Sequence, residues 1–185
     1  MQSEYFAFLR SRGRVGKYLR RLFLRPIVRY FSGRVLDIGS GIGEFLEQYP
    51  NAVGLDINED CVKYCVQKGL RCVQADVSTL PFENDSFDGV LLNNVLEHFE
   101  KPDEVFSEIL RVLRDGGRLM IEVPGKKGFA YDRTHVRFWD REDLMQYLEM
   151  RGFGEIQTSF FPVPLRLAGV FLTHNKLRVY ARLRK

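Results

Sequence analysis

Residues 35–45 read VLDIGSGIGEF, and this stretch decides the fold. It predicts a short apolar strand with an acid, Asp37, near its end, then a loop with glycine at every second position, then a helix over 44–48. Because glycine lacks Cβ, such a loop can adopt positive φ and let a bulky nucleoside lie against the backbone. The stretch therefore predicts a nucleoside-binding edge at the carboxyl ends of parallel strands.

A dinucleotide such as NAD is the first ligand to test against this loop, since G-x-G-x-x-G also follows a first strand. Counted from Gly39 and Gly41, that fingerprint requires glycine at the position that Glu44 occupies. A carboxylate at the start of a helix would repel a pyrophosphate bound there. Asp37 likewise disfavours an anionic linker and suits a cationic amine. The loop is expected to bind a cationic nucleoside and not a dinucleotide.

Two further acids follow predicted strands. Asp56 lies about 20 residues after Asp37, where a carboxylate can accept hydrogen bonds from both hydroxyls of a ribose. Asp76 follows the next strand. The carboxyl ends of parallel strands share one edge of a sheet, so these acids suit a ligand with a cationic amine, a free ribose and an adenine. S-adenosylmethionine is such a ligand.

Hydrophobic periodicity predicts alternating strands and helices, which is typical of βαβ units. The predicted strands are 34–38, 52–57, 71–74, 87–94 and 118–123, with 153–161 and 176–183 as a terminal antiparallel pair. Strand 87–94 is apolar along its centre and should be central in the sheet. Besides 44–48, the predicted helices are 59–68, 101–113, 140–150 and a basic amphipathic helix over 17–31, which Pro26 should bend or split.

Composition bounds the class of protein. The chain has 185 residues, of which 45% are hydrophobic and 28% charged, as in a soluble protein with one core. We expect a single domain over 1–185, with 1–32 as a basic helical extension and 33–185 as the core. The sequence shows no secretion signal and no apolar run of about 20 residues, so a cytoplasmic protein is expected, at most peripheral to a membrane. The three cysteines, Cys61, Cys65 and Cys72, lack zinc-site spacing and should be reduced and packed, and no metal is expected.

Charge is distributed unevenly along the chain. Residues 1–34 hold 9 Lys and Arg against one acid, residues 35–159 hold 13 against 23, and residues 160–185 hold 6 against none. Basic ends on an acidic body favour an anionic partner, such as a phosphate-bearing small molecule, a membrane surface or a nucleic acid. The alternative is that these charges lie on solvated helix and strand faces.

As a set, these motifs resemble the class I S-adenosylmethionine-dependent methyltransferases, in particular their small type-11-like branch. The resemblance covers roughly 34–153 and rests on DIGSGIG (37–43), DI (56–57), QADVSTLPFENDSFDGVLLNNVLEH (74–98), LRVLRDGGRLMIEVP (110–124) and HVRFWDREDL (135–144). It implies an α/β, Rossmann-like, doubly wound sheet of seven mostly parallel strands in the order 3-2-1-4-5-7-6, with strand 7 antiparallel and helices on both faces.

The resemblance also assigns roles in binding S-adenosylmethionine. The strand-end acid and the glycine loop would hold the methionine end, the second acid the ribose, the third acid and two apolar residues the adenine, and an asparagine pair would border the methyl group. In that order these residues are Asp37, Gly39, Ser40, Gly41 and Gly43; Asp56; Ile57, Asp76 and Val77; Asn93 and Asn94.

Methyl transfer is an in-line displacement at a sulfonium, so the enzyme mainly has to align the acceptor. A general base helps where the acceptor is a hydroxyl or a carbon acid, and the candidates by position are His98, Tyr131 and His135. Each could instead have a structural role. We expect segments 1–32, 125–135 and 162–174 to select the acceptor.

The acceptor itself is not identified by the sequence. A small-molecule or lipid-like acceptor is favoured, because these segments mix basic and apolar side chains. Nucleic acid is less favoured, since the fourth strand is followed by NNVLEH and not by the Asn/Asp-Pro-Pro-aromatic run of enzymes that methylate exocyclic amines. The alternatives are an RNA or protein methyltransferase that uses the basic ends, and a non-catalytic module that binds S-adenosylmethionine.

Overall fold

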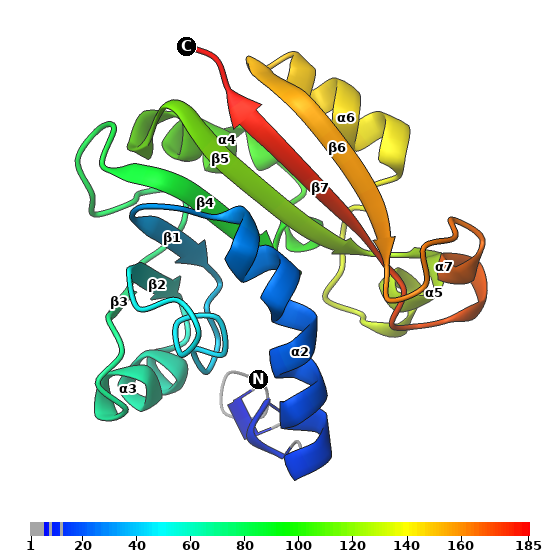
Figure 1. Cartoon of the computed structure of the whole chain (residues 1–185), viewed down its shortest axis with the longest axis horizontal. Coiled ribbons are helices and arrows are strands. Elements are labelled where there is room, and N and C mark those ends of the chain that lie inside the picture. Colours follow the sequence, from blue (N-terminus) through cyan, green and yellow to red (C-terminus); the bar gives the residue numbers. More distant parts are fainter. Residues whose placement is uncertain (1–5, 8, 12) are drawn as a thin grey trace.

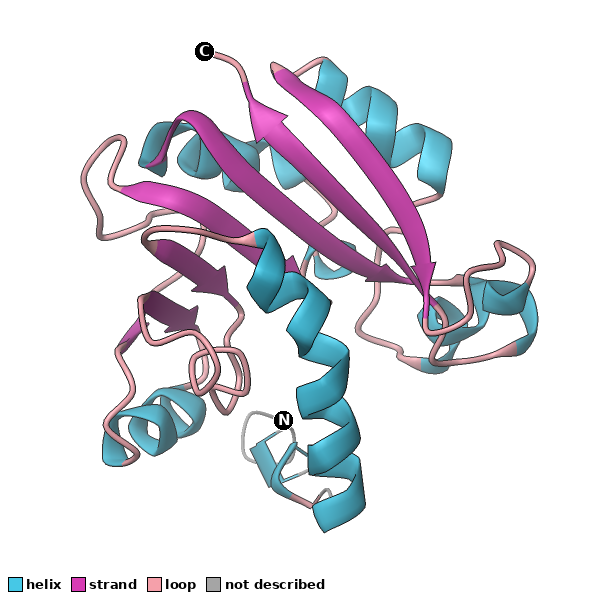
Figure 2. Cartoon of the chain, viewed as in Figure 1, coloured by secondary structure: helices cyan, strands magenta, loops and turns pink. Residues whose placement is uncertain are grey.

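In the computed structural model, the residues that are described (6–7, 9–11 and 13–185) form one seven-stranded sheet (Figures 1 and 2). Its strands, in spatial order, are β3 (Cys72–Gln74), β2 (Ala52–Asp56), β1 (Val35–Ile38), β4 (Phe87–Asn93), β5 (Leu113–Pro124), β7 (Lys176–Leu183) and β6 (Phe153–Phe161). β3 to β5 run parallel, and β7 is antiparallel to both β5 and β6. The predicted strand order is confirmed.

Helices cover both faces of the sheet. On one face α4 (Pro102–Val112) and α6 (Arg141–Glu149) pack on a core that includes Leu36, and on the other α2 (Arg14–Tyr30) and α3 (Glu59–Gln67) pack on a core that includes Val35. Successive residues of a strand point to opposite faces, so each central strand serves both cores. Three short elements join the sheet at its carboxyl edge: η1 (Leu96–His98), α5 (Lys126–Tyr131) and α7 (Ala168–Phe171).

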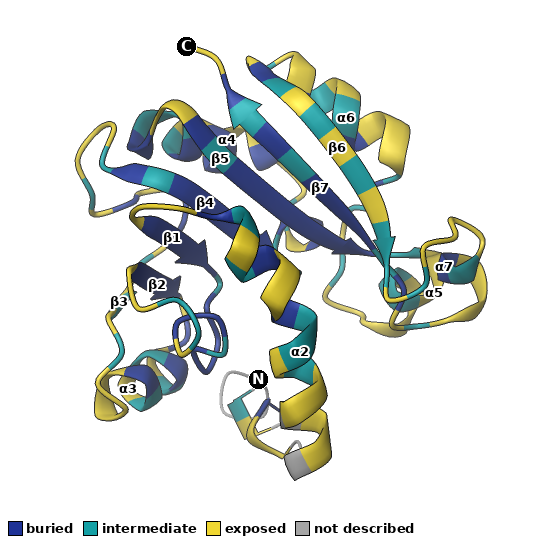
Figure 3. Cartoon of the chain, viewed as in Figure 1, coloured by how far each residue is buried: buried dark blue, intermediate teal, exposed yellow. Residues whose placement is uncertain are grey.

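β4 is the central strand that the apolar run predicts. It pairs with β1 on one side and β5 on the other, and the residues at its centre are buried (Figure 3). Burial on both faces explains why its sequence is continuously apolar and does not alternate. The carboxyl ends of β1, β4 and β5 therefore meet at one rigid edge.

Four predicted features of the secondary structure are wrong. The first is the start of β5, which begins at Leu113 and not at residue 118. Residues 44–48 form successive turns and not a helix, because Gly41 and Gly43 both adopt positive φ and Pro50 follows closely. The basic helix begins earlier than predicted and continues through Pro26 without a break, since residues on both sides of the proline are buried against the sheet. The loop after β5 contains α5.

α2 is amphipathic, with apolar side chains on the sheet and Arg21, Arg25 and Arg29 exposed. None of the helices in the described part of the chain has both the length and the apolar character needed to span a bilayer.

The cations of the basic C-terminal region pair with four carboxylates, Glu142, Glu122, Glu155 and Asp85. Each of its six Lys and Arg side chains lies within 4.0 Å of an Asp or Glu carboxylate. The pairs are Arg166–Glu142, Lys176–Glu122, Arg178–Glu122, Arg182–Glu155, Arg184–Glu155 and Lys185–Asp85. The uneven charge of the sequence is therefore, at this end, internal ion pairing.

One buried carboxylate joins α2, β5 and β7. Glu122 is 1% exposed, and its oxygens accept from Lys176 Nζ over 2.8 Å and from Arg178 Nε over 2.6 Å. Arg20 Nη1 of α2 lies 3.9 Å from the same carboxylate. Burial would raise the pKa of Glu122, but the charges of Lys176, Arg178 and Arg20 outweigh it and lower the pKa to about 2. Glu122 is therefore ionised and fixes three cations around it.

Glu122→Gln should lower the free energy of unfolding by about 3 to 5 kcal/mol at neutral pH, because it leaves buried cations without their counter-charge. The pKa of Glu122 falls from 4.5 to about 2 on folding. The difference in the free energy of unfolding between the native protein and the variant should therefore have its full size above about pH 4.5 and shrink as the pH falls toward 2. Urea unfolding over this pH range measures it.

Glu142→Gln is the matched control, because Glu142 makes an exposed two-bond pair with Arg166 at 2.9 and 2.8 Å. Its loss should cost no more than about 1 kcal/mol. Equal destabilisation by the two substitutions would show that the Glu122 cluster contributes no more than an ordinary surface pair.

Candidate active site

A cavity of about 540 Å³ opens at the carboxyl ends of β1, β4 and β5. The glycine loop forms one wall, the segment around α5 the opposite wall, and Arg20 and Leu24 of α2 a third. Nine of the residues predicted for the site line this cavity: Asp37, Gly39, Ser40, Gly41, Asn93, Asn94, His98, Tyr131 and His135. Segments 1–32, 125–135 and 162–174 all contribute to its wall.

The glycine loop is held close against its neighbours. Gly39 has φ +69°, and a Cβ added there would lie 2.5 Å from Val95 Cγ2, so no side chain fits. The amides of Gly39 and Ser40 both donate to the carbonyl of Leu55 in β2, over 2.7 and 3.0 Å. The loop therefore presents bare backbone to the cavity, which is what close approach of a ligand requires.

Asp37 is the buried acid of the cavity. Its side chain is 3% exposed, and within the described part of the chain no hydrogen bond or ion pair reaches its carboxylate. Burial, with the nearby Cys72 and Asp56, raises the pKa of Asp37 well above its usual range. An unpartnered buried carboxylate is stabilised by a cation. The ammonium group of the methionine end of S-adenosylmethionine fits this position.

Asp56 holds the glycine loop in place. It is 7% exposed, and its carboxylate accepts from Gly41 N over 2.7 Å and from Asn58 N over 2.9 Å. These bonds join the carboxyl end of β2 to the loop after β1. Asp56 does not line the cavity but lies directly behind the loop that does.

The other predicted nucleoside contacts also lie outside the cavity, around the ends of β2 and β3. Ile57 is 58% exposed. Asp76 is exposed and accepts from Ser78 N and Ser78 Oγ, both over 2.8 Å. Val77 is buried in the core, which leaves its backbone as the part able to contact a ligand, and Gly43 faces Leu70 and Cys65. The structure thus separates a cavity from a more open nucleoside edge.

The N-terminal segment covers the glycine loop, a feature that the sequence did not indicate. Leu9 is buried with Ile42 and Cys61 and lines the cavity, and Phe6 makes an edge contact with Tyr64 of α3 at 5.7 Å. Residues 1–5, 8 and 12 of the predicted extension lie outside the described residues. The cysteines are free, as predicted, and pack beneath the loop.

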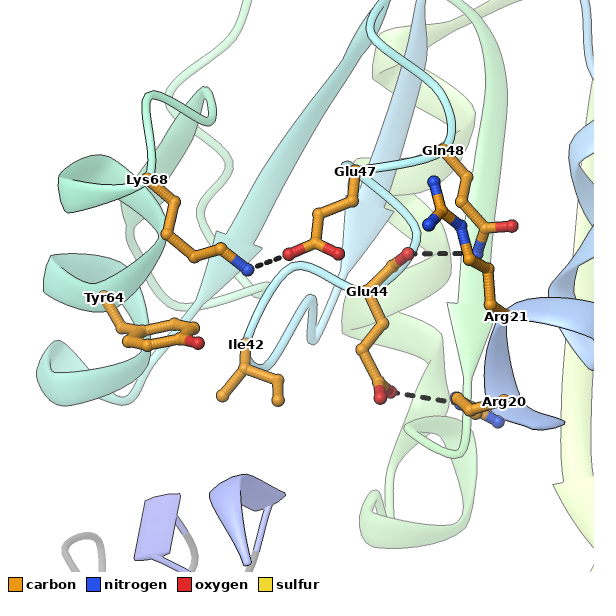
Figure 4. Close-up of a pocket in the computed structure, with 8 residues that line it drawn as sticks. All are labelled: Arg20, Arg21, Ile42, Glu44, Glu47, Gln48, Tyr64 and Lys68. Carbon is orange, nitrogen blue, oxygen red and sulfur yellow. Dashed lines mark hydrogen bonds and ion pairs between the residues drawn. The ribbon is translucent and has the colours of Figure 1, made fainter. Parts of the chain in front are cut away.

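A smaller hollow of about 140 Å³ lies between α2, the glycine loop and α3 (Figure 4). Arg20 Nε donates to Glu44 Oε2 over 3.1 Å, and Lys68 pairs with Glu47 on the other side. Glu44 therefore meets a cation from α2 and not a ligand phosphate. The Arg20–Glu44 pair in this hollow ties α2 to the loop.

Asn93 links this edge to the buried cluster around Glu122. With the amide nitrogen facing Glu122 and the oxygen facing Arg20, Asn93 donates to the carboxylate over 3.0 Å and accepts from the guanidinium over 2.9 Å. Asn94 has φ +57°, and its backbone amide donates to Glu122 O over 2.8 Å. The asparagine pair is therefore rigidly held between the two ends of the cavity.

Two histidines lie together in the wall of the cavity. The rings of His98 and His135 lie 4.9 Å apart, and His135 also stacks on Phe129. Tyr131 is at the cavity rim and is 82% exposed. The structure brings the two predicted histidines together and leaves Tyr131 in solvent.

Glu97 beside these histidines was missed from the sequence. It is 1% exposed, and burial raises the pKa of Glu97 to about 8. Its backbone carbonyl accepts from Val136 N and Arg137 N, which docks the loop carrying His135. A single glutamate in the sequence LEH does not by itself predict that its side chain will be buried.

Comparison with known proteins identifies the family. Residues 36–121 match the family model described as a methyltransferase domain. An uncharacterised protein of Methanocaldococcus jannaschii is 35% identical over 138 residues, which are 69% of this chain and 67% of that protein. A malonyl-[acyl-carrier protein] O-methyltransferase of Methylococcus capsulatus is 32% identical over 145 residues, 67% of this chain but about half (53%) of that protein.

A solved structure agrees. The crystal structure of a SAM-dependent methyltransferase from Archaeoglobus fulgidus superposes with a TM-score of 0.75 at 26% identity, covering 90% of this chain and 94% of that one. With the glycine loop, the buried Asp37 and the strand order, these matches show that the chain belongs to the class I S-adenosylmethionine-dependent methyltransferases.

Proposed function

We propose that this protein transfers a methyl group to a small-molecule or lipid-like acceptor held in the cavity between the glycine loop and α5. Bound S-adenosylmethionine supplies a methyl group on a sulfonium sulfur, which needs alignment more than activation. The observation that carries the proposal is one cavity with an unpartnered carboxylate, Asp37, at one end and two adjacent histidines at the other.

The residues along this edge suit each part of the cofactor in turn. Asp37 would accept the ammonium group, and the backbone of the glycine loop would lie against the methionine chain. Asp56 and Asp76 would face the ribose and the adenine amino group at the ends of β2 and β3. A cofactor bound in this orientation would have its methyl group beside Asn93 and Asn94, which line the cavity.

The acceptor end suits a molecule with an apolar part. Outside the lining of the cavity, Leu165, Leu167 and Phe171 are exposed in and before α7, and Lys127, whose Nζ donates to Phe171 O over 2.8 Å, places a cation beside Phe171. An amphiphilic anion would match this mixture. The relative from Methylococcus capsulatus is named as a malonyl-[acyl-carrier protein] O-methyltransferase, which supports an oxygen atom of a small acyl group as the acceptor.

His98 and His135 are the residues that would touch the acceptor. Both line the cavity, and each ring has its Nδ1 engaged by backbone. Tyr131, in solvent at the rim, is placed to contact a bulky acceptor and not to take its proton.

Transfer of labelled methyl groups tests the acceptor class. The protein is incubated with methyl-labelled S-adenosylmethionine and a cell extract, which is then separated into acid-precipitated RNA and protein, an aqueous small-molecule fraction and a solvent-extracted fraction. We expect label in the small-molecule or solvent fractions. Label confined to RNA or protein would replace this proposal with the macromolecular alternative, and no transfer by a protein that binds S-adenosylmethionine would favour a binding module.

Asp37→Asn should weaken binding of both S-adenosylmethionine and S-adenosylhomocysteine by about 10- to 150-fold at neutral pH, because both carry the ammonium group. Burial raises the pKa of Asp37. As the pH falls through that raised pKa, the native protein should lose affinity because protonated Asp37 is neutral, while the affinity of the variant stays low and flat. Calorimetric titration across pH measures both effects. Weakening for S-adenosylmethionine alone would place Asp37 at the sulfonium.

Asp56→Ala should weaken S-adenosylmethionine binding by about 10- to 150-fold, since it removes the proposed ribose contacts together with the bond to Gly41 N. Asp56→Asn keeps one acceptor oxygen and should lose less. Asp143→Ala, an exposed acid in the first turn of α6, is the control and should bind normally. Unchanged affinity of Asp56→Ala in the same titration would mean that the ribose lies elsewhere.

A further inference from the structure

Three metal-ligating side chains meet at the acceptor end of the cavity. Glu97, His98 and His135 each place one ligand atom within 4.8 Å of the others, and His135 Nε2 lies 3.8 Å from Glu97 Oε1. Glu97 and His98 come from η1, and His135 comes from the loop after α5. The fold therefore joins a dipeptide to a residue 37 positions later in the sequence.

Glu97 has no other task that explains its burial. It is nine-tenths or more buried, and neither of its carboxylate oxygens has a hydrogen-bond partner among the residues that the structure describes. A buried carboxylate without partners is costly to a fold unless something pairs with it. A metal ion between Glu97 and the two imidazoles would supply that partner.

Both histidines are held as metal ligands usually are. His98 Nδ1 lies 3.2 Å from Thr134 O, and His135 Nδ1 lies 3.0 Å from Phe129 O. A backbone carbonyl accepts a hydrogen bond from Nδ1–H, so the proton stays on Nδ1 and the lone pair of Nε2 in the same ring is left for a metal. This is the outer-shell contact that fixes the tautomer and orientation of metal-binding histidines.

A fourth donor lies on the open side. Asp132 Oδ2 is 3.8 Å from His135 Nε2, while Asp132 Oδ1 accepts from the amide and the hydroxyl of Thr134. Asp132, His98 and His135 line the cavity, so an ion bound here would keep a coordination position facing the acceptor. Two imidazoles and two carboxylates are a donor set that suits divalent zinc, manganese or iron.

We propose that Glu97, His98 and His135, joined by Asp132, bind a divalent transition-metal ion that coordinates the acceptor of methyl transfer. The proposal that a metal ion binds is argued from the positions of these side chains, and the role of the ion in methyl transfer rests on the proposed function. It revises the expectation from sequence that no metal is held. LEH and a distant histidine have none of the spacing that marks a metal motif, because the loop after α5 brings them together.

The role follows from the chemistry of metal-bound oxygen. An acceptor hydroxyl that becomes a ligand loses its proton to water more readily, because the metal stabilises the oxygen anion that remains. That oxygen would attack the methyl carbon of S-adenosylmethionine while the carbon–sulfur bond breaks and S-adenosylhomocysteine leaves, so no side chain would have to act as a strong base. The acceptor class is therefore an alcohol or phenol whose oxygen can reach the ion.

Metal binding is tested on the full, tag-free chain after removal of metal by a chelator. Zn²⁺ is titrated by calorimetry, and Co²⁺ is followed by its visible absorption, which reports nitrogen and oxygen ligation without any turnover. We expect one ion per chain, and at least about tenfold weaker binding for Glu97→Gln, His98→Asn and His135→Ala. The matched control is His174→Ala, the third histidine of the chain, which lines the same cavity outside the cluster and should bind Zn²⁺ normally.

The outcomes separate this inference from the proposed function. Zn²⁺ affinity weaker than about 100 μM in the native protein, or equal losses in His135→Ala and His174→Ala, overturns the metal site. S-adenosylmethionine is titrated into the same samples. Binding of S-adenosylmethionine without binding of Zn²⁺ would refute the metal site and leave the proposed function standing. Binding of Zn²⁺ without binding of S-adenosylmethionine would refute the proposed function of the cavity and leave the metal site standing. Circular dichroism identifies any variant that fails to fold. If a histidine variant does so, the Zn²⁺ affinity of the near-isosteric Glu97→Gln variant is the test of the metal site.

Discussion

The burial of one ionised carboxylate, Glu122, constrains the positions of α2 and β7 at the edge of the sheet where the cavity opens. Glu122 can remain charged inside the sheet because Lys176, Arg178 and Arg20 surround it, and these cations come from a late strand and an early helix. Any shift of α2 or β7 would leave a charge uncompensated in a medium where that is costly. The same carboxylate orders Asn93, so the requirement for charge balance also fixes the wall between the two ends of the cavity.

The two ends of the cavity are built by different means. The proposed cofactor end comes from contiguous sequence, in which a strand, a glycine loop and the next strand are tied together by backbone hydrogen bonds and by the Asp56 carboxylate. The proposed acceptor end is assembled from segments that are distant in sequence, held by contacts such as those between Glu97 O and the amides of Val136 and Arg137. In the proposed function, a compact local motif thus binds S-adenosylmethionine, while loops from distant parts of the sequence face the acceptor.

This difference explains what could be predicted from the sequence. Strand order and the glycine loop follow from local periodicity and a compact motif, and the cavity does contain Asp37, Asn93 and both histidines. Glu97 was missed because burial of an acid depends on which loop covers it, and the cover of Leu9 over the glycine loop likewise depends on tertiary packing. The helix over 44–48 failed because glycines at positive φ override a short helical pattern.

The position of β7 has a consequence for how the chain is made. β7 follows β6 in sequence but lies between β5 and β6, so both strands have an open edge until it is synthesised. On the ribosome, Glu122 also waits for Lys176 and Arg178, which emerge more than fifty residues later. A nascent chain that stops short of β7 would carry two unpaired strand edges and a Glu122 carboxylate that lacks two of its three cations. This is the kind of intermediate that chaperones shield from aggregation.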